Sequence, residues 1–315
     1  MIINNIRDIL IRLGIYEYVH HILASARLLL LSLIFYPCRF VYSYLAFTLQ
    51  KKHDSAGADM KTISLLCPTR GHPTDAARLV LNVHRTVRFP ERIEILFYID
   101  SDDPFKNDYL ALLGAAKKRF RRLMRCEAIV GERMNISKSW NALARECKGE
   151  LLFMANDDKV YVDYGWDIQL DKETKKFPDG IFCMWFNDIR VAEFSACFPV
   201  VSRVWYEALG YFTPDVFEFY VNDTWIWDIA KRIGRLHYIP YMHIIHPYMT
   251  FYSFAKSLLK IHRQYSPLRK GSDADQQTKM YWRDNLLFHA IHSRREEEAK
   301  KLKAIIDSRK SNLKK

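Results

Sequence analysis

Glycine and cysteine are scarce in this sequence: 11 glycines and six cysteines are spread over 315 residues. So little glycine excludes a collagen-like chain, which needs glycine at every third position. The cysteines form no CxxC pair, and a chain of this length is not a small disulfide scaffold. Since 49% of the residues are apolar and 14% are aromatic, a disordered chain is also excluded. We expect a globular protein with free thiols in a reducing compartment.

An uninterrupted membrane-spanning segment is also missing. The run from Leu28 to Leu49 has the length of a transmembrane helix, but Pro37 and Arg39 fall at its centre, and a central arginine costs roughly 2.5–3.5 kcal/mol to insert. The stretch before residue 24 is too polar for the core of a cleaved signal peptide. We therefore expect residues 1–53 to form a membrane-associated helical segment that lies on or dips into the cytoplasmic leaflet. A helical hairpin packed on the protein itself is the alternative.

Positive charge is in excess overall but scarce in the middle of the chain. The formal net charge is +12, and residues 1–53 and 294–315 together carry 15 Lys and Arg against six Asp and Glu, which accounts for +9 of it. The body between them is nearly neutral, and no interleaving of basic and aromatic residues marks a face for nucleic acid. This pattern indicates a catalytic domain whose basic ends touch an anionic surface, so we expect a membrane partner and no nucleic acid.

Beyond residue 61, short apolar runs alternate with amphipathic stretches. Strands are expected at 62–67, 93–99, 124–130, 150–155, 180–186, 194–201 and 236–241, and helices at 76–87, 109–123, 137–147, 204–209, 222–234, 254–265 and 277–306. This alternation predicts an α/β fold with a mostly parallel sheet and helices on both faces. In such sheets, ligands bind beyond the carboxyl ends of the strands.

The residues that follow three of these strands are polar. They are Pro68-Thr69-Arg70-Gly71 after the first strand, Asp100-Ser101-Asp102-Asp103 after the second and Asn156-Asp157-Asp158 after the fourth. Two acidic clusters at two strand ends repel each other unless a cation or a donor-rich ligand lies between them. An oxygen-rich site for Mg²⁺ or Mn²⁺ that holds a diphosphate resolves this repulsion. Taken alone, residues 156–158 also fit an ordinary turn after a strand.

These motifs resemble those of GT-A glycosyltransferases, in particular the family 2 type. The likeness is carried by CPTRG at the end of the first strand, by YIDSDDP at the end of the second, and by SWNALARECKGELLFMANDD, a helix followed by a strand that ends in the acidic triplet. It covers residues 61–247. The resemblance implies a GT-A (Rossmann-like) catalytic domain at residues 61–250, and we expect residues 251–315 to form a C-terminal helical extension.

The resemblance also implies roles for individual residues. Those expected to bind the nucleotide sugar are Pro68, Thr69 and Arg70, which line the nucleotide pocket, Asp100, which bonds the base, Asp102, and Arg133 and Lys138, which meet the diphosphate unless they belong to a solvated loop. Asn156, Asp157 and Asp158 correspond to the DxD triplet, with Asp157 facing the sugar or ribose and Asp158 binding the metal. His246 matches a third metal ligand better than His243 does.

In relatives of this type, an acidic residue at the start of the helix expected at 222–234 is the general base. Asp223 has that position and would deprotonate the acceptor hydroxyl in an inverting displacement, while Asp228 is the weaker candidate. An N-cap is the structural alternative for Asp223, and the two roles are compatible. Trp185, Trp225 and Trp227 are candidates for sugar stacking, and core packing is the competing interpretation.

The sequence thus predicts a membrane-associated, metal-dependent glycosyltransferase that moves a sugar from a nucleotide-diphosphate donor to a hydroxyl of a glycan or lipid-linked acceptor. A sugar-phosphate nucleotidyltransferase is a second interpretation, but residues 68–71 lack the glycine-rich basic loop that holds a triphosphate. A non-catalytic scaffold that binds nucleotide sugar or glycan is the third, and the joint presence of Asp100, Asp158 and Asp223 argues against it.

Overall fold

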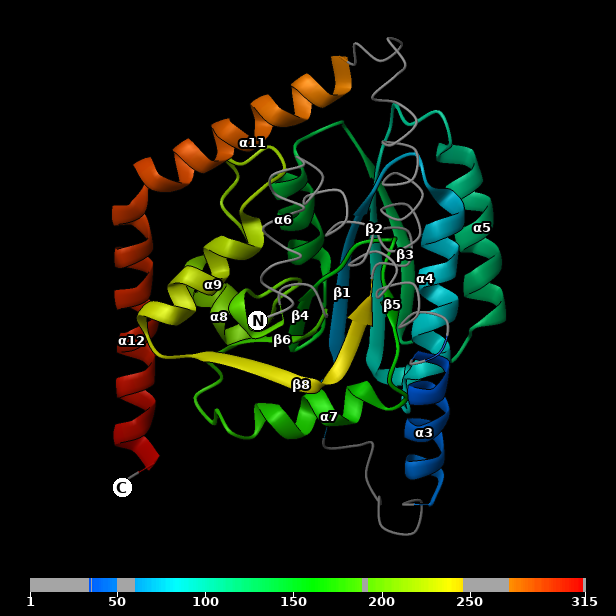
Figure 1. The fold of residues 1–315 in the computed structure, drawn as a ribbon, viewed down its shortest axis with the longest axis horizontal. Helices are drawn as coiled ribbons and strands as arrows, with labels where there is room; N and C mark the ends of the chain where they lie inside the picture. Colours follow the sequence, from blue (N-terminus) through cyan, green and yellow to red (C-terminus); the bar gives the residue numbers. More distant parts are fainter. Residues whose placement is uncertain (1–33, 35, 50–59, 189–191, 246–271, 314–315) are drawn as a thin grey trace, which may run out of the picture.

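Eight strands form one curled sheet at the centre of the molecule (Figure 1). The computed structural model describes residue 34 and residues 36–49, 60–188, 192–245 and 272–313. The strands are β1 (Ile63–Thr69), β2 (Ile93–Asp100), β3 (Arg125–Gly131), β4 (Leu151–Met154), β5 (Val160–Tyr161), β6 (Cys183–Asn187), β7 (Val200–Ser202) and β8 (Leu236–Ile245). Their order is β3-β2-β1-β4-β7-β6-β8-β5. The first four are mutually parallel, and β7 is antiparallel to both of its neighbours.

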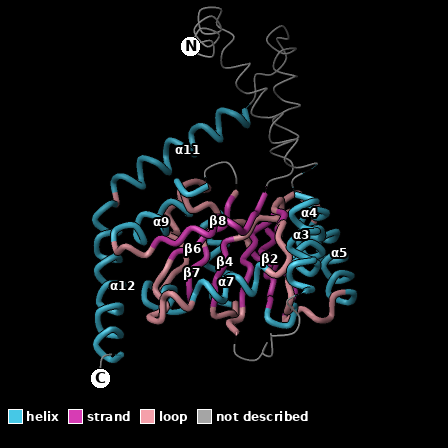
Figure 2. The backbone as a smooth tube through the Cα atoms, turned by 60° about the horizontal axis from the view of Figure 1, so that its bottom comes forward, coloured by secondary structure: helices cyan, strands magenta, loops and turns pink. Residues whose placement is uncertain are grey.

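Helices cover both faces of this sheet. On one face lie α4 (Pro73–Thr86), α5 (Lys106–Arg119) and α7 (Trp166–Thr174), and on the other α6 (Ile136–Glu146), α8 (Arg203–Leu209), α9 (Asn222–Arg232) and α12 (His292–Leu313). Figure 2 shows the strands between α9 and α12 on one side and α4 and α5 on the other. The expected α/β fold with helices on both faces is therefore confirmed.

Successive side chains of the central strands point to opposite faces of the sheet, so each strand contributes to two hydrophobic cores. In β1, Leu65 and Cys67 pack with α4 and α5, while Leu66 between them packs with α6. All eight residues of β2 are buried. Strands that are apolar on both faces are typical of a parallel sheet covered by helices, because neither face meets water.

The N-terminal helix α3 (Tyr36–Leu49) lies against the domain. Arg39, which interrupts the apolar run of the sequence, donates from Nε to Oδ1 of the buried Asp163 at 2.7 Å and from Nη2 to the Tyr241 carbonyl at 3.0 Å. The backbone N–H of Tyr164 donates to the Ser43 hydroxyl at 2.9 Å. Within the part of the chain that the structure describes, no helix combines the length and the apolar character that crossing a membrane requires.

Two expected elements differ from the structure. The strand expected at 194–201 is reduced to β7, preceded by the short 3₁₀ helix η4 (Ala192–Phe194), because Phe198 has a φ of +56° and Pro199 has no N–H for a sheet ladder. The single helix expected at 277–306 is two helices, α11 (Ser272–Ala290) and α12, with a turn at Ile291. The helix expected at 254–265 lies outside the described residues.

The helix α7 is absent from the sequence-based expectation because its buried side chains include acids. Asp167 accepts the backbone N–H groups of Arg88 and Phe89 at 2.9 and 3.0 Å, and Asp171 accepts that of Lys61 at 2.7 Å. These carboxylates bond the backbone of neighbouring loops instead of facing water. An acid on the inner face of a helix breaks the apolar period on which the sequence reading depends.

Candidate functional site

A cavity of about 690 Å³ opens at the carboxyl ends of β1, β2 and β4. Its lining includes eight of the residues predicted for a site, which are Pro68, Thr69, Arg70, Asp100, Arg133, Asn156, Asp157 and Asp158. The parallel order β2-β1-β4 brings their carboxyl ends to one edge of the sheet, so residues up to 90 positions apart meet there. The structure thus places the three polar strand ends around one space.

The end of β1 is fixed by hydrogen bonds to buried groups. The Thr69 hydroxyl donates to Asp157 Oδ2 and lies 2.8 Å from the hydroxyl of Tyr109. That phenol also accepts the backbone N–H of His72 at 2.8 Å. Burial raises the pKa of Tyr109 to about 12, so the phenol stays protonated at neutral pH. The loop after β1 therefore holds its shape before any ligand binds.

An arginine joins the ends of β1 and β2. Arg70 Nη1 donates to Asp100 Oδ2 at 2.8 Å and to Asp102 Oδ1 at 2.6 Å. Arg133 Nη1 lies 3.8 Å from Asp102 Oδ2. The pairing with Arg70 lowers the pKa of Asp102, which keeps this carboxylate ionised. Asp102 is half exposed and does not line the cavity. Its role is to hold the two arginines in place.

The acidic triplet after β4 lies in a partly desolvated position. Burial raises the pKa of Asp157 to about 6, against the opposing hydrogen bond from the Thr69 hydroxyl. Burial also raises the pKa of Asp158, and the neighbouring Lys159 ammonium opposes that rise. The Asn156 Oδ1 is buried with no hydrogen-bond partner among the described residues. Carboxylate and amide oxygens that are partly shielded from water suit a hard divalent cation, because its positive charge offsets the cost of burying ionised carboxylates.

A buried lysine adjoins this triplet, and no sequence motif indicated it. The Lys159 side chain is 1% exposed, and its Nζ lies 4.0 Å from Asp158 Oδ1 and 3.7 Å from the centroid of the Phe198 ring. Burial raises the pKa of Asp223, and the Lys159 ammonium opposes that rise. The charge of Lys159 thus acts on both the triplet and the proposed base. Its position directly after two aspartates was the available sequence signal.

The proposed base Asp223 lies in the first turn of α9 and does not line the cavity. Its Oδ1 accepts the backbone N–H of Thr224 at 2.7 Å, and burial raises its pKa. The N-cap residue of α9 is Val221, so the interpretation of Asp223 as the cap is wrong. Val221 has a φ of +59°, a costly conformation for a β-branched residue. The conformation of Val221 thus fixes where the first turn of α9, and with it Asp223, begins.

The neighbouring Asn222 connects this turn to α6. The Ser137 hydroxyl donates to Asn222 Oδ1 at 2.7 Å, and both side chains are buried. Ser137 lies between Ile136, which lines the cavity, and Lys138, which does not. The contact ties the start of α9 to the wall of the cavity.

Several other candidates have structural roles or different places. Lys138 lines a second pocket, and His246 lies outside the described residues. His243 Nδ1 lies 2.8 Å from Asp163, on the side where α3 docks. Asp228 Oδ2 accepts Nε–H groups of Arg232 and Arg295, both at 2.7 Å, which makes it a poor candidate for a base.

Of the three tryptophans, Trp185 is 2% and Trp225 0% exposed, so both belong to the core. Sugar stacking on these two is therefore ruled out. Trp227 is half-buried, with the Lys231 ammonium 4.8 Å from its ring centroid.

The cavity also has walls that the sequence analysis missed. These residues are His72, Tyr98, Met134, Asn135, Ile136, Ser139, Glu218, Phe219, Gln276 and Met280. The Tyr98 hydroxyl donates to the Glu132 carbonyl at 2.8 Å, and a Cβ on Gly131 would overlap that hydroxyl, so a larger residue there would displace the Tyr98 side chain. Glu218 and Phe219 come from a loop held by Asp284 of α11, which no sequence pattern links to β1.

The chain resembles solved glycosyltransferases in structure. Over 91% of this chain and 87% of the other, it matches mannosyltransferase PcManGT from Pyrobaculum calidifontis, solved with GDP-Man and Mn²⁺, with a TM-score of 0.51 and 13% identity. Residues 1–349 of S. aureus TarS match with a TM-score of 0.46 and 10% identity, over 80% of this chain and 92% of that one. GalNAc-T7, solved with UDP, GalNAc and Mn²⁺, matches with a TM-score of 0.47 and 14% identity, over 60% and 44%.

The match to PcManGT shows that the chain has a GT-A fold, as the sequence motifs imply. No protein-family model matches the sequence, and no curated protein is similar to it. At 13% identity the likeness concerns the fold, so the chemistry has to be argued from the cavity itself.

Proposed function

We propose that this chain is a metal-dependent glycosyltransferase that transfers a sugar from a nucleotide-diphosphate donor to a hydroxyl acceptor. The observation that carries the proposal is the cavity at the ends of β1, β2 and β4, where Arg70 and Asp100 meet Asp157 and Asp158. One end of this cavity offers a guanidinium and carboxylates for polar groups of a nucleoside. The other end offers buried oxygen ligands for a cation that accompanies a diphosphate.

In this proposal, the end of the cavity near β2 binds the nucleoside. Asp100 and Arg70 bond each other at 2.8 Å, so the carboxylate is fixed where it can accept N–H groups of a base. Tyr98 lines the same side of the cavity as a buried side chain, with its hydroxyl on the Glu132 carbonyl. Arg133 faces the same space and is placed to meet phosphate oxygens.

Asp158, with Asp157 and Asn156 in support, would hold Mn²⁺ or Mg²⁺. The bound cation would neutralise the charge that develops on the departing nucleoside diphosphate. Among the described residues, no group of three His, Cys, Asp or Glu side chains is arranged to bind a metal, which agrees with a cation held by one or two carboxylates together with donor phosphates. The third ligand proposed from the sequence, His246, lies outside the described residues.

Asp223 is the proposed general base for an inverting displacement. Burial raises its pKa, which makes the carboxylate a stronger proton acceptor than an exposed aspartate. Its role is to take the proton from the acceptor hydroxyl as the oxygen attacks the sugar carbon. Asn222 and Ser137 hold the start of α9 against the wall of the donor cavity, which supports this assignment.

We further propose that the enzyme acts at the cytoplasmic face of a membrane on a glycan or lipid-linked acceptor. The exposed side of α3 supports this, because Val41, Tyr42 and Leu45 are apolar or aromatic and face solvent. Such side chains on a docked helix suit the headgroup region of a bilayer.

The experiment that tests the proposed function measures nucleoside diphosphate release from a panel of UDP-, GDP- and dTDP-sugars by the full chain. We expect one nucleotide class to be hydrolysed slowly with Mn²⁺ and not in EDTA, since glycosyltransferases transfer to water when no acceptor is present. A CMP-sugar in the same panel reports release of CMP. Absence of release from every donor by folded protein with Mn²⁺ would contradict the proposal.

A further inference from the structure

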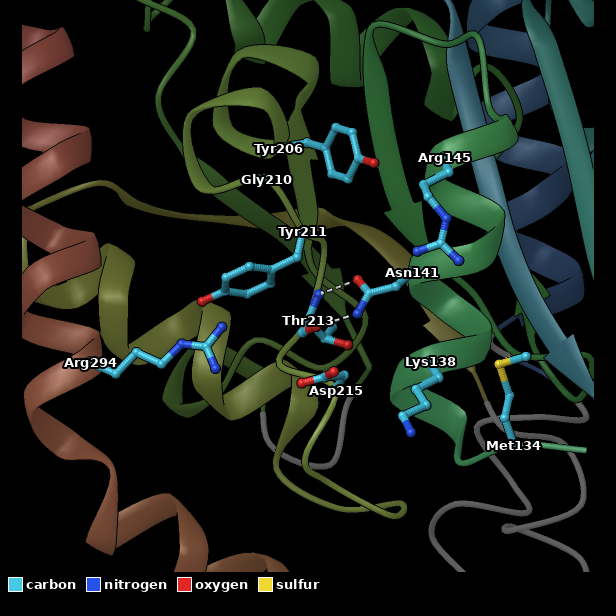
Figure 3. A pocket seen from close by; sticks show the side chains of 10 residues that line it. All are labelled: Met134, Lys138, Asn141, Arg145, Tyr206, Gly210, Tyr211, Thr213, Asp215 and Arg294. Atoms are coloured by element: carbon cyan, nitrogen blue, oxygen red, sulfur yellow. Dashed lines mark hydrogen bonds between the residues drawn. The ribbon is translucent and has the colours of Figure 1, made fainter.

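A second pocket of about 470 Å³ lies beside the donor cavity, and α6 lines both. Figure 3 shows its walls: Lys138, Asn141 and Arg145 come from α6, Tyr206 from α8, Tyr211, Thr213 and Asp215 from the connection to α9, and Arg294 from α12. Met134 lines both this pocket and the donor cavity. The second pocket is therefore a separate space next to the donor site.

Its charge is positive and comes from two opposing walls. Lys138 and Arg145 stand on one face of α6, seven residues apart, and Arg294 reaches in from α12 (Figure 3). Against these three cations the lining has one carboxylate, that of Asp215. Neither the Lys138 ammonium nor the Arg145 guanidinium has an ion pair or hydrogen bond within the described part of the chain. The lining thus carries a net charge of +2.

The walls are held in place by buried hydrogen bonds. Asn141 Nδ2 donates to the Thr213 carbonyl at 2.6 Å, and Asn141 Oδ1 accepts the backbone N–H groups of Phe212 and Thr213 at 2.8 and 3.1 Å. These bonds fix the α8–α9 connection to α6. The pocket keeps its shape without a ligand, so little ordering cost opposes binding.

The third cation is fixed as well. Arg294 Nε donates to Glu298 Oε1 at 2.8 Å, and its guanidinium carbon lies 4.7 Å from the centroid of the Tyr211 ring. This pairing leaves the guanidinium directed toward the pocket, as Figure 3 shows. A guanidinium held on both an acid and a ring loses little freedom when an anion binds.

We propose that this pocket binds a phosphate group. A phosphate ester carries about −1.5 to −2 at neutral pH and several acceptor oxygens, so it can meet Lys138 and Arg145 together, whereas a carboxylate offers one charge and two oxygens. Arg145 offers parallel N–H donors for two phosphate oxygens, and Lys138 offers a point charge beside it. The rings of Tyr206 and Tyr211 provide contact area for an organic group attached to the phosphate. The inference requires only the pocket and does not depend on sugar transfer.

The test is calorimetric titration of the full chain, in EDTA, with inorganic phosphate and with glycerol 1-phosphate. Arg145→Gln and Lys138→Gln remove exposed, unpaired charges, so both variants are expected to fold. Each is expected to weaken binding of both probes by about tenfold, the loss of one charge-assisted hydrogen bond. Tighter binding of glycerol 1-phosphate than of phosphate identifies a phosphorylated organic ligand, and the reverse order identifies free phosphate; either supports the site.

Two controls separate this pocket from other cations. Lys118→Gln removes an exposed charge on α5, on the opposite face of the sheet, and Arg133→Gln removes a cation of the donor cavity. Lys118→Gln is expected to leave the affinity for the two probes unchanged, and Arg133→Gln shows whether the donor cavity accounts for the binding. Absence of saturable binding, or an affinity that falls with Arg133→Gln but not with Arg145→Gln and Lys138→Gln, overturns the proposal. The donor-release assay is independent of this result, so either proposal can fail alone.

Discussion

Asp223 and Asp228 lie five residues apart in α9, and their surroundings differ. Asp223 is half-buried and has a raised pKa, and its Oδ1 accepts the backbone N–H of the neighbouring Thr224. Asp228 is held by Arg232 and by the buried Arg295 of α12. Because Asp228 Oδ2 already accepts two guanidinium N–H groups, it is poorly placed to take a proton from an acceptor hydroxyl.

We therefore expect the same substitution to lower turnover at Asp223 and to lower stability at Asp228. Asp223→Asn is expected to lower turnover by about 10²- to 10⁴-fold with donor binding unchanged, since it removes only proton transfer. Asp228→Asn is expected to lower the unfolding free energy by roughly 3 kcal/mol, because it breaks a partly buried ion pair, with turnover retained. Steady-state kinetics and urea denaturation of both variants check this. An Asp228→Asn variant that is stable but inactive would exchange the two roles.

The titration of Asp157 predicts a pH dependence of stability in the metal-free protein. Its pKa in the folded protein is about 6, above the value of 3.8 for an unperturbed aspartate. The folded state thus binds the Asp157 proton more tightly than the unfolded state does. The resulting contribution to the free energy of unfolding is fully present below about pH 4 and is lost as the pH rises through about 6.

Asp157→Asn removes this titration and keeps an oxygen for the Thr69 hydroxyl. We compare the free energy of unfolding of the variant with that of the wild-type protein. Between pH 4 and pH 7.5 this difference is expected to change in favour of the variant by up to about 3 kcal/mol, which corresponds to a shift of roughly two pKa units. Urea denaturation in EDTA at the two pH values measures it. A difference that does not change with pH would show that Asp157 titrates normally.

At the scale of elements, the turn between α6 and β4 fixes the position of β4 along β1, and so the position of the acidic triplet that follows β4. The buried Glu94 of β2 accepts the backbone N–H groups of Lys148 and Gly149 and the Ser64 hydroxyl. A Cβ on Gly149 would lie 2.7 Å from the Ser64 backbone nitrogen, so the turn packs directly on β1.

Gly149→Ala is therefore expected to lower the unfolding free energy by roughly 1–3 kcal/mol, because the backbone of β1 or of the turn has to move. Gly114→Ala in α5 is the matched control, since a Cβ there meets nothing within 4 Å. In that helix, alanine is expected to stabilise by about 0.5–1 kcal/mol. Denaturant midpoints of the two variants give the comparison. Equal effects at both positions would mean that the turn is not closely packed.

At the scale of the whole molecule, α3 has two contrasting sides. Arg39 and Ser43 attach one side to the domain, and Leu45, which is 53% exposed, belongs to the other. The basic ends of the chain add positive charge, which would attract anionic lipid in the proposed membrane attachment. Membrane attachment at this side would keep the domain beside lipid-linked acceptors.

Leu45→Glu is accordingly expected to reduce co-sedimentation of the full chain with phosphatidylcholine vesicles that contain phosphatidylglycerol. Leu110→Glu is the matched control, because Leu110 is an exposed leucine on α5, in another part of the surface. We expect at least a several-fold loss for Leu45→Glu and no change for Leu110→Glu, since an acid in the interface loses apolar contact and meets anionic lipid. Equal sedimentation of both variants with the wild-type protein would contradict attachment through α3.

The central strands and the polar residues after them could be predicted from sequence, because a strand buried on both faces is a short apolar run that ends abruptly. The helix α7 and the loop at Glu218 could not. Their positions depend on carboxylates that bond distant backbone, as Asp167 does with Arg88 and Asp284 does with Glu218. The same limit applies to Trp225, since its burial under α12 depends on packing between distant segments.

The most direct measurement of the central claim is calorimetric titration of the full chain with UDP, GDP, CMP and dTDP, with and without Mn²⁺, on the wild-type protein, Asp158→Asn and the exposed control Asp108→Asn. The account predicts that one nucleotide binds tightly only with Mn²⁺, that Asp158→Asn abolishes this dependence, and that Asp108→Asn leaves it intact. Metal-independent binding that Asp158→Asn does not change, or no binding by folded protein, would contradict it.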